Sequence, residues 1–186
     1  MQINHFPETN GFEIQFGIHN KNHIDLIKFF QFDIINLIFT LNSADIVEQN
    51  HTVVTKPVEN TGESGEANVQ LLFYHLFKDC GIPQYYLNMK MSLDIQEHAL
   101  QYTSEVIRDT PDFIETLPTR MRQPKPIPIS KMDITIDIPG PCMAAVVVSF
   151  SFDDNGTGLM SQRTQMVTMI FKRMFSRLKE FIETMS

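Results

Sequence analysis

The amino-acid sequence predicts one mixed domain of the α/β (α+β) class. Several segments alternate apolar and polar residues, as half-buried strands do. Two longer segments carry apolar residues at the spacing of one helix face. The chain has 186 residues, of which 42% are hydrophobic and 20% charged. This length and composition suit a single globular domain over residues 1–186 with a hydrophobic core of its own.

Four segments predict strands clearly, and a fifth does so weakly. Residues 12–18, 85–93 and 132–138 alternate apolar with polar side chains, and a period of two is that of a strand with one buried face. Residues 144–152 are rich in β-branched and aromatic side chains, which favour strands. Residues 51–58 form a weaker candidate that ends near a proline.

Two helices are predicted in the first half of the chain. The first covers residues 23–41, with Asn22 as its cap and Asp25 in its first turn, and it is apolar nearly all round. Residues 59–68 are rich in glycine and acidic side chains and predict a loop. A short helix is expected after this loop, at residues 69–79, because its apolar residues follow helical spacing.

A central helix is predicted from Asp94 to about residue 110. Asp94 and Glu97 have the spacing of a capping box, and Pro111 should kink or end the helix. The expected inner face consists of Ile95, Ala99, Tyr102 and Val106. A short continuation is expected after the kink, and a basic, proline-rich linker follows at residues 119–130.

The chain is predicted to end in a long helix at about residues 159–185. Its apolar residues follow heptad spacing, while Lys172, Arg173 and Arg177 add positive charge to an otherwise acidic chain. Such a helix can lie on an anionic membrane or in the groove of a partner. We favour the other interpretation, in which the apolar face covers the sheet and the charges are solvated.

Composition argues against several classes of function. The formal net charge of -7 disfavours a nucleic-acid partner, which needs a basic face. The N-terminal residues lack the pattern of a signal peptide, and no apolar run is long enough to span a bilayer. We therefore expect a cytoplasmic protein.

No motif in the sequence predicts catalysis, a cofactor or a metal site. The chain has two cysteines, Cys80 and Cys142, which by themselves cannot hold a zinc ion. Cys80 with His75 or His98 would be a nucleophile and base, but no third residue is apparent to orient them. We therefore expect a protein that is not an enzyme and acts by binding other proteins.

Several segments, in order along the chain, resemble HORMA domains. Residues 24–43 are similar to the first helix of that family. Residues 80–93, 98–124 and 146–178 are similar, respectively, to a strand, the central helix, and the last strand and C-terminal helix of a HORMA subunit of the autophagy-initiation kinase complex. The resemblance implies a mostly antiparallel sheet packed against about three to four helices.

The same resemblance implies a non-catalytic adaptor. It would pair with and stabilise a second HORMA subunit, contact the kinase and scaffold through that subunit, and help recruit downstream factors to autophagosome formation sites. Membrane contact is then expected only indirectly. The implied partner face is the polar side of the central helix, formed by His98, Gln101, Glu105 and Arg108.

The family's middle loop often carries an exposed Trp-Phe finger for recruitment, but this chain has no tryptophan. Phe77, Ile82 and Pro83 are the residues of the corresponding short loop. Two alternatives remain open at this point. One is a checkpoint-type HORMA adaptor. The other is a histone-fold transcription subunit, in which residues 129–138 would form a loop and the third helix.

Overall fold

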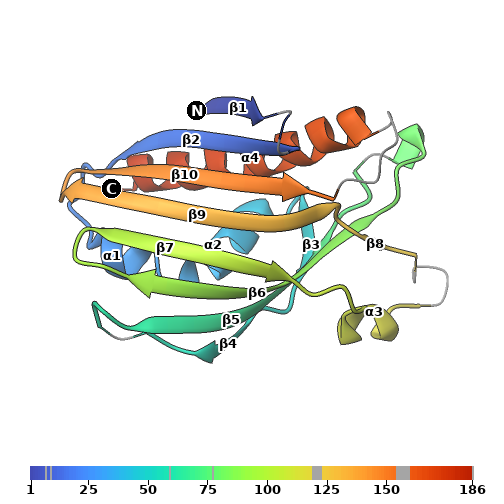
Figure 1. Ribbon diagram of the computed structural model, residues 1–186, viewed down its shortest axis with the longest axis horizontal. Helices are drawn as coiled ribbons and strands as arrows, with labels where there is room; N and C mark the ends of the chain where they lie inside the picture. The colour runs from blue at the N-terminus through green and yellow to red at the C-terminus, as the bar shows by residue number, and fades with distance from the viewer. Residues whose placement is uncertain are drawn as a thin grey trace.

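One large sheet forms the framework of the protein (Figure 1). The computed structural model describes residues 1–6, 8, 10–58, 60–76, 78–118, 123–153 and 160–185. The strands within this part of the chain are β1 (Gln2–Phe6), β2 (Gly11–His19), β3 (Val47–Asn50), β4 (Val53–Lys56), β5 (Ser64–Phe73), β6 (Tyr85–Ile95), β7 (Ala99–Val106), β8 (Lys125–Pro126), β9 (Ile129–Gly140) and β10 (Met143–Phe152).

The sheet has the order β1-β2-β10-β9-β7-β6-β5-β3, and neighbours along this path pair antiparallel. β4 joins the same edge as β3, antiparallel to β5, and the short β8 is parallel to β6. β2, near the start of the chain, thus lies beside β10, the last strand of the described part, close to the β1 edge of the sheet. The predicted α+β class with a mostly antiparallel sheet is confirmed.

Helices cover one face of the sheet, and a short helix lies on the other. α1 (Leu26–Phe29), α2 (Asp33–Asn42) and α4 (Met160–Thr184) lie behind the sheet in Figure 1. α3 (Asp112–Thr116) packs with Leu72 and Tyr86, whose neighbours in β5 and β6 face the main core. Because adjacent residues of a strand point to opposite faces, α3 covers the outer face.

The long C-terminal helix was predicted correctly, and its apolar side does cover the sheet. Phe171 packs on Phe150 of β10 with ring centroids 4.9 Å apart, and Phe175 packs on Phe16 of β2 at 6.1 Å. α4 therefore packs across both β2 and β10. No helix in the described part of the chain is both long and apolar enough to cross a membrane.

The predicted first helix is divided into α1 and α2. Its cap is Asp25, whose carboxylate accepts a hydrogen bond from the Lys28 amide, rather than Asn22. The chain turns between the two helices, and both Phe30 and Phe32 are buried there. A straight helix cannot place all the apolar residues of 23–41 against one sheet, so the break serves their burial.

The short helix expected at residues 69–79 is wrong, because β5 occupies Ser64–Phe73. Gly65, Ala67, Val69 and Leu71 are all buried on the sheet's inner face, with the period of a strand. Leu72 also is buried, beneath α3 on the outer face. Because both faces of the strand are buried at its end, Leu71, Leu72 and Phe73 are all apolar, and this run matched the spacing of a helix.

The predicted central helix is also wrong, because residues 94–110 contain the end of β6, a turn and β7. The Gln96 amide donates to the Ala99 carbonyl at 2.8 Å and closes the hairpin between these strands. Leu100, Tyr102 and Ser104 point inward, which is strand alternation. Ser104 obscured the pattern because it is polar; its buried hydroxyl accepts from the Met132 amide at 2.8 Å.

Most of the remaining predictions are confirmed. β2, β6, β9 and β10 lie on the four clear strand predictions, and β4 lies within the weaker one. The strands β1 and β3 were missed, and the predicted loop at residues 59–68 contains the start of β5. The short continuation after Pro111 is α3. The predicted linker holds β8 and the start of β9, and its residues 119–122 lie outside the described part of the chain. The sheet excludes the histone-fold alternative, because residues 129–138 belong to β9.

Gly65 is a glycine whose missing side chain the packing requires. A Cβ atom there would overlap a methyl group of Val58 and lie 2.8 Å from the Lys56 carbonyl oxygen and 2.9 Å from the Phe32 ring. β4, β5 and the α1–α2 turn approach one another closely at this point. The crowding includes backbone, so it cannot be relieved by a side-chain rotation alone.

We expect Gly65→Ala to lower the free energy of unfolding by about 1–3 kcal/mol through overpacking. Gly140→Ala is the matched control, since no atom lies within 4 Å of a Cβ built at Gly140. Urea unfolding followed by circular dichroism measures both changes. Equal stability of the two variants would contradict the close approach at Gly65.

Candidate functional site

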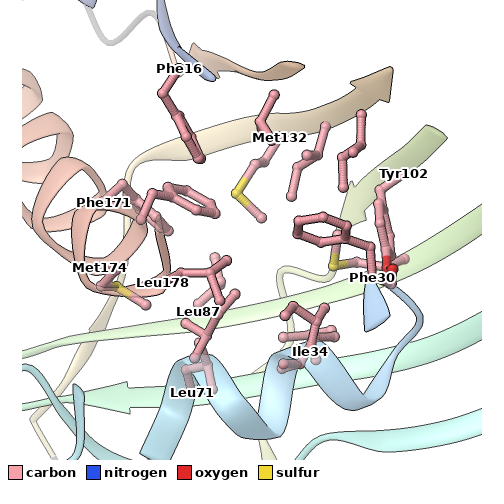
Figure 2. Close-up of a pocket in the computed structure, with 18 residues that line it drawn as sticks. Phe16, Phe30, Ile34, Leu71, Leu87, Tyr102, Met132, Phe171, Met174 and Leu178 are labelled. Carbon is pink, nitrogen blue, oxygen red and sulfur yellow. The ribbon is translucent and has the colours of Figure 1, made fainter. Parts of the chain in front are cut away.

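An apolar cavity lies between the inner face of the sheet and the helices that cover it. Its free volume, the space open to the centre of a water-sized sphere, is ≈ 70 Å³. Side chains from α2, α4 and the central strands converge on it (Figure 2). The wall consists of Phe16, Phe30, Ile34, Ile35, Ile38, Val69, Leu71, Leu87, Met91, Tyr102, Met132, Ile134, Ile136, Val146, Phe171, Met174, Phe175 and Leu178.

Tyr102 is the single residue of the wall with a polar side chain, and its hydroxyl is already bonded. It donates to the carbonyl oxygen of Phe30 at the α1–α2 turn, and both side chains are seen together in Figure 2. Burial raises the pKa of the Tyr102 phenol, so the group stays neutral. The hydroxyl therefore holds the turn against β7 and offers the cavity no free charge.

Three methionines make the wall adaptable. Met91, Met132 and Met174 come from β6, β9 and α4 and reach the cavity from different sides. A methionine side chain has three rotatable bonds and fills irregular spaces at low cost. The cavity is smaller than the about 300–1,000 Å³ typical of ligand pockets, so a larger guest needs these side chains to move outward.

Two residues of the cavity wall are only partly buried. Ile38 of α2 and Ile134 of β9 are half-buried, whereas the other residues of the wall are buried. Ile134 pairs with Tyr102 and Val148 in the middle of the sheet, so its partial exposure marks a gap in the helix layer above β9.

The chemistry weighed from the sequence is not assembled in the structure. Cys80 is exposed, and the His75 ring bonds instead to the Ile82 carbonyl oxygen at 2.7 Å. The structure brings together a different pair, Cys142 Sγ and His23 Nδ1, at 3.6 Å. Among the described residues no group of three or more His, Cys, Asp or Glu side chains is placed to hold a metal ion.

The four residues predicted as a partner face do not lie on a helix. His98 is exposed in the turn before β7, and Gln101 and Glu105 point outward from that strand. Arg108 follows β7, and its guanidinium forms two hydrogen bonds to the Asp153 carboxylate, at 2.7 and 2.8 Å. All four residues thus remain exposed, but on β7 and its flanking turns rather than on a helix.

The predicted recruitment loop is only partly described. Phe77 lies outside the described residues. Ile82 and Pro83 are half-buried, and Ile82 packs against the main core. Ile82 therefore contributes to packing and is not an exposed finger.

The three basic residues predicted as a membrane or partner contact on the last helix differ in their interactions. Lys172 is half-buried and forms no ion pair with the described residues. Arg173 and Arg177 both bind Asp45, which follows α2, at 2.6 Å. Arg177 also donates to the Leu41 carbonyl oxygen at 3.3 Å and to Asn42 Oδ1 at 3.2 Å. Sequence spacing gave no signal of this link, because its partners are more than a hundred residues apart.

Solved structures share this fold. The human StarD13 lipid transfer and protein localization domain matches 94% of this chain and 78% of its own at 7% identity, with a TM-score of 0.60. The di-domain aromatase/cyclase BexL of the BE-7585A biosynthetic pathway matches 95% of this chain and 50% of its own at 10% identity, TM-score 0.52. Human STARD10 matches 92% and 65% at 7% identity, also with a TM-score of 0.52.

These likenesses show the fold alone. No family model matches the sequence, and no curated protein is similar to it. None of the three structures is named as a HORMA domain. The resemblance of the sequence to that family stays a prediction that these comparisons do not test.

The ion pairs of Asp45 with Arg173 and Arg177 contribute to the stability of the folded state in a pH-dependent way. Hydrogen bonding from Arg177 holds the pKa of Asp45 below its ordinary value of 3.8. A carboxylate with a lowered pKa in the folded state stabilises that state above the ordinary pKa. The stabilisation is lost as the pH falls through the folded-state pKa. With 36% of the Asp45 side chain exposed, solvent screening keeps the effect small.

We expect Asp45→Asn to lower the free energy of unfolding by about 0.5–1 kcal/mol at neutral pH, and the difference from the unchanged protein to shrink below about pH 3. Urea unfolding at both pH values measures this. Asp137→Asn is the control, since Asp137 is an exposed carboxylate without an ion pair in the described structure. A loss that is independent of pH would contradict the electrostatic origin.

Proposed function

We propose that this protein binds a small, chain-like apolar molecule in the cavity between the sheet and the helices. The observation that carries the proposal is the chemistry of the wall, where the one polar side chain, Tyr102, has its hydroxyl bonded to the protein. A charged or strongly polar guest would lose its hydration there without finding a partner. A hydrocarbon chain has no hydrogen bonds to water to lose, and its transfer from water into the cavity is favourable.

The shape of the site also favours a chain. The cavity runs between several strands on one side and two helices on the other, with methionines at separate points of its wall. Flexible side chains can move aside along a narrow guest one at a time. Each buried methylene contributes about 0.8 kcal/mol, which is about a fourfold increase in affinity.

The fold supports the proposal without determining the ligand. StarD13, which has this fold, is described as carrying a lipid transfer and protein localization domain, and BexL as an aromatase/cyclase. Both descriptions concern proteins at or below 10% identity. They indicate that this fold is compatible with binding an apolar molecule. The class of ligand is inferred from the apolar residues that line the cavity.

Val146→Phe tests the cavity as the binding site. Val146 is buried in the wall, and the next residue of β10, Val147, points to the opposite face. We expect Val146→Phe to weaken binding of the neutral fluorescent probe N-phenylnaphthylamine, and of decanol that displaces it, by at least about tenfold, because the larger ring fills the cavity. Val147→Phe should bind as the unchanged protein does.

Circular dichroism and thermal unfolding must show that both variants fold. Lengthening the alcohol from hexanol to decanol should tighten binding by about fourfold per methylene until the cavity is full. Equal binding by the two folded variants would place the probe outside the cavity. Absence of binding to the unchanged protein would overturn the proposal.

A second proposal comes from the HORMA resemblance: a non-catalytic adaptor that pairs with the second HORMA subunit of the autophagy-initiation kinase complex. The observation that favours a partner face is that Gln101 and Glu105 point outward from one strand beside the exposed His98. Polar residues that share one exposed face can form a rim for a partner. A contact there would leave the cavity free, so the two proposals are compatible.

Co-expression with that subunit from the same organism tests the adaptor. We expect a stoichiometric complex on size-exclusion chromatography, and weaker association after Gln101→Arg with Glu105→Arg, because the two added cations disturb the rim. Arg108 is unsuitable for this test, since its replacement also breaks the pair with Asp153. A folded chain that elutes separately from the subunit would contradict this second proposal.

A further inference from the structure

Two arginines share one carboxylate at the junction of α2 and α4. Arg177 forms two hydrogen bonds to Asp45, at 2.6 and 2.9 Å, and Arg173 forms one at 2.6 Å. Two positive charges thus face one negative charge, which leaves a net positive site. The side chains of Arg177 and Arg173 are 28% and 60% exposed, so the group can be reached from solvent.

This charged group lies about one helical turn from the cavity wall on both helices. On α4, Met174 and Leu178 line the cavity, and Arg173 and Arg177 directly precede them in the sequence. On α2, Ile38 lines the cavity, and the Arg177 guanidinium bonds to Asn42, four residues further along. One turn of a helix advances about 5.4 Å, so the positive site adjoins the apolar wall.

The half-buried Ile38 connects these two features. It belongs to the cavity wall and is one of two wall residues that the helices leave partly uncovered. It also lies on the turn of α2 that leads to the arginines, since its carbonyl oxygen accepts a hydrogen bond from Asn42 Nδ2 at 2.7 Å. A molecule that passes Ile38 into the cavity would have its outer end near Arg177.

We propose that Arg173 and Arg177 bind the single anionic head, a carboxylate or a phosphate, of an amphiphile whose chain lies in the cavity, and that Asp45 occupies this site when no ligand is bound. The proposal rests on the proposed function, because the chain must enter the cavity. It deepens that function by naming the class of ligand, an acyl or alkyl chain with one negative group.

The chemistry of the arginines suits this role. A guanidinium presents its donors in a plane that matches the two oxygens of a carboxylate or phosphate. Arg177 already makes this two-point contact with Asp45, so the Asp45 carboxylate stands in for the head of the ligand. Asp45 is 36% exposed, and it can turn to water when displaced without the cost of burying an unpaired charge.

Matched ligands separate the head from the chain. Decanol, decanoic acid and decyl phosphate carry the same alkyl chain length, and each can be titrated against bound N-phenylnaphthylamine at neutral pH. For the unchanged protein we expect the two anions to bind about tenfold more tightly than decanol, because charge-assisted hydrogen bonds form in addition to the apolar contacts. Inorganic phosphate, which lacks a chain, should displace no probe.

Three variants test the residues. Arg173→Gln with Arg177→Gln should remove the preference, so that decanoic acid and decyl phosphate no longer bind more tightly than decanol to the same variant. Lys172→Gln removes one positive charge from the same helix and should keep the preference, which excludes a general effect of helix charge. Asp45→Asn should tighten anion binding by about threefold to tenfold, because the internal competitor is gone while both cations remain.

The Asp45→Asn result separates a binding site from a purely structural link. If Asp45 only tied α2 to α4, its loss would loosen the site and weaken all three ligands. Equal binding of decanol and the two anions by the unchanged protein would overturn the head site and leave the apolar cavity standing. Failure of every ligand and of the probe would overturn the proposed function itself.

Discussion

The structure depends on the burial of one face of a strongly curved sheet. Alternate residues of its central strands are apolar, and together they form a continuous inner face. Such a face is not stable in water, so it needs a cover of matching length. α4 provides most of this cover through Phe171 and Phe175, which pack on the two strands where the beginning and the end of the chain meet.

One straight helix cannot cover the whole inner face of the sheet. The cavity lies beneath the part of that face that α4 does not fill. α1 and α2 cover the side nearer β6 and β7, but they must turn at Phe30 to do so, and Tyr102 holds that turn from the sheet. The space that remains lies where three surfaces meet without filling one another completely. The methionines in its wall suit a space that changes volume, because they repack without strain.

Charged side chains and neutral polar side chains occupy different parts of the structure. Some ion pairs lie at the margins of the helix layer, where Asp45 links α2 with α4, and Lys179 with Glu183 lies against β2. Others lie on the strands or directly after them, such as Lys90 with Glu66 and Arg108 with Asp153. The interior has neutral polar groups instead, and each buried polar side-chain atom within the described residues has a hydrogen-bond partner. An acidic chain can therefore present a locally positive site beside an apolar interior.

The strand predictions at residues 12–18, 85–93 and 132–138 succeeded because one face of each strand is buried and carries apolar side chains while most residues of the other face are polar, so the pattern has the period of two. β5 and β7 were misassigned for opposite reasons. β5 has apolar residues on both faces near its end because α3 covers the outer face, and β7 has the polar Ser104 on its inner face. In both strands a tertiary contact altered the local pattern.

The sequence by itself determined the class of fold, the strands β2, β4, β6, β9 and β10, and the long C-terminal helix, because these follow from periodicities within short segments. The tertiary structure alone decided the cavity, the Tyr102 bond to Phe30 and the meeting of Asp45 with Arg173 and Arg177. Those features join residues separated by 72 to 132 positions. Local patterns carry no information about such distances, which are set by the order in which the strands pair.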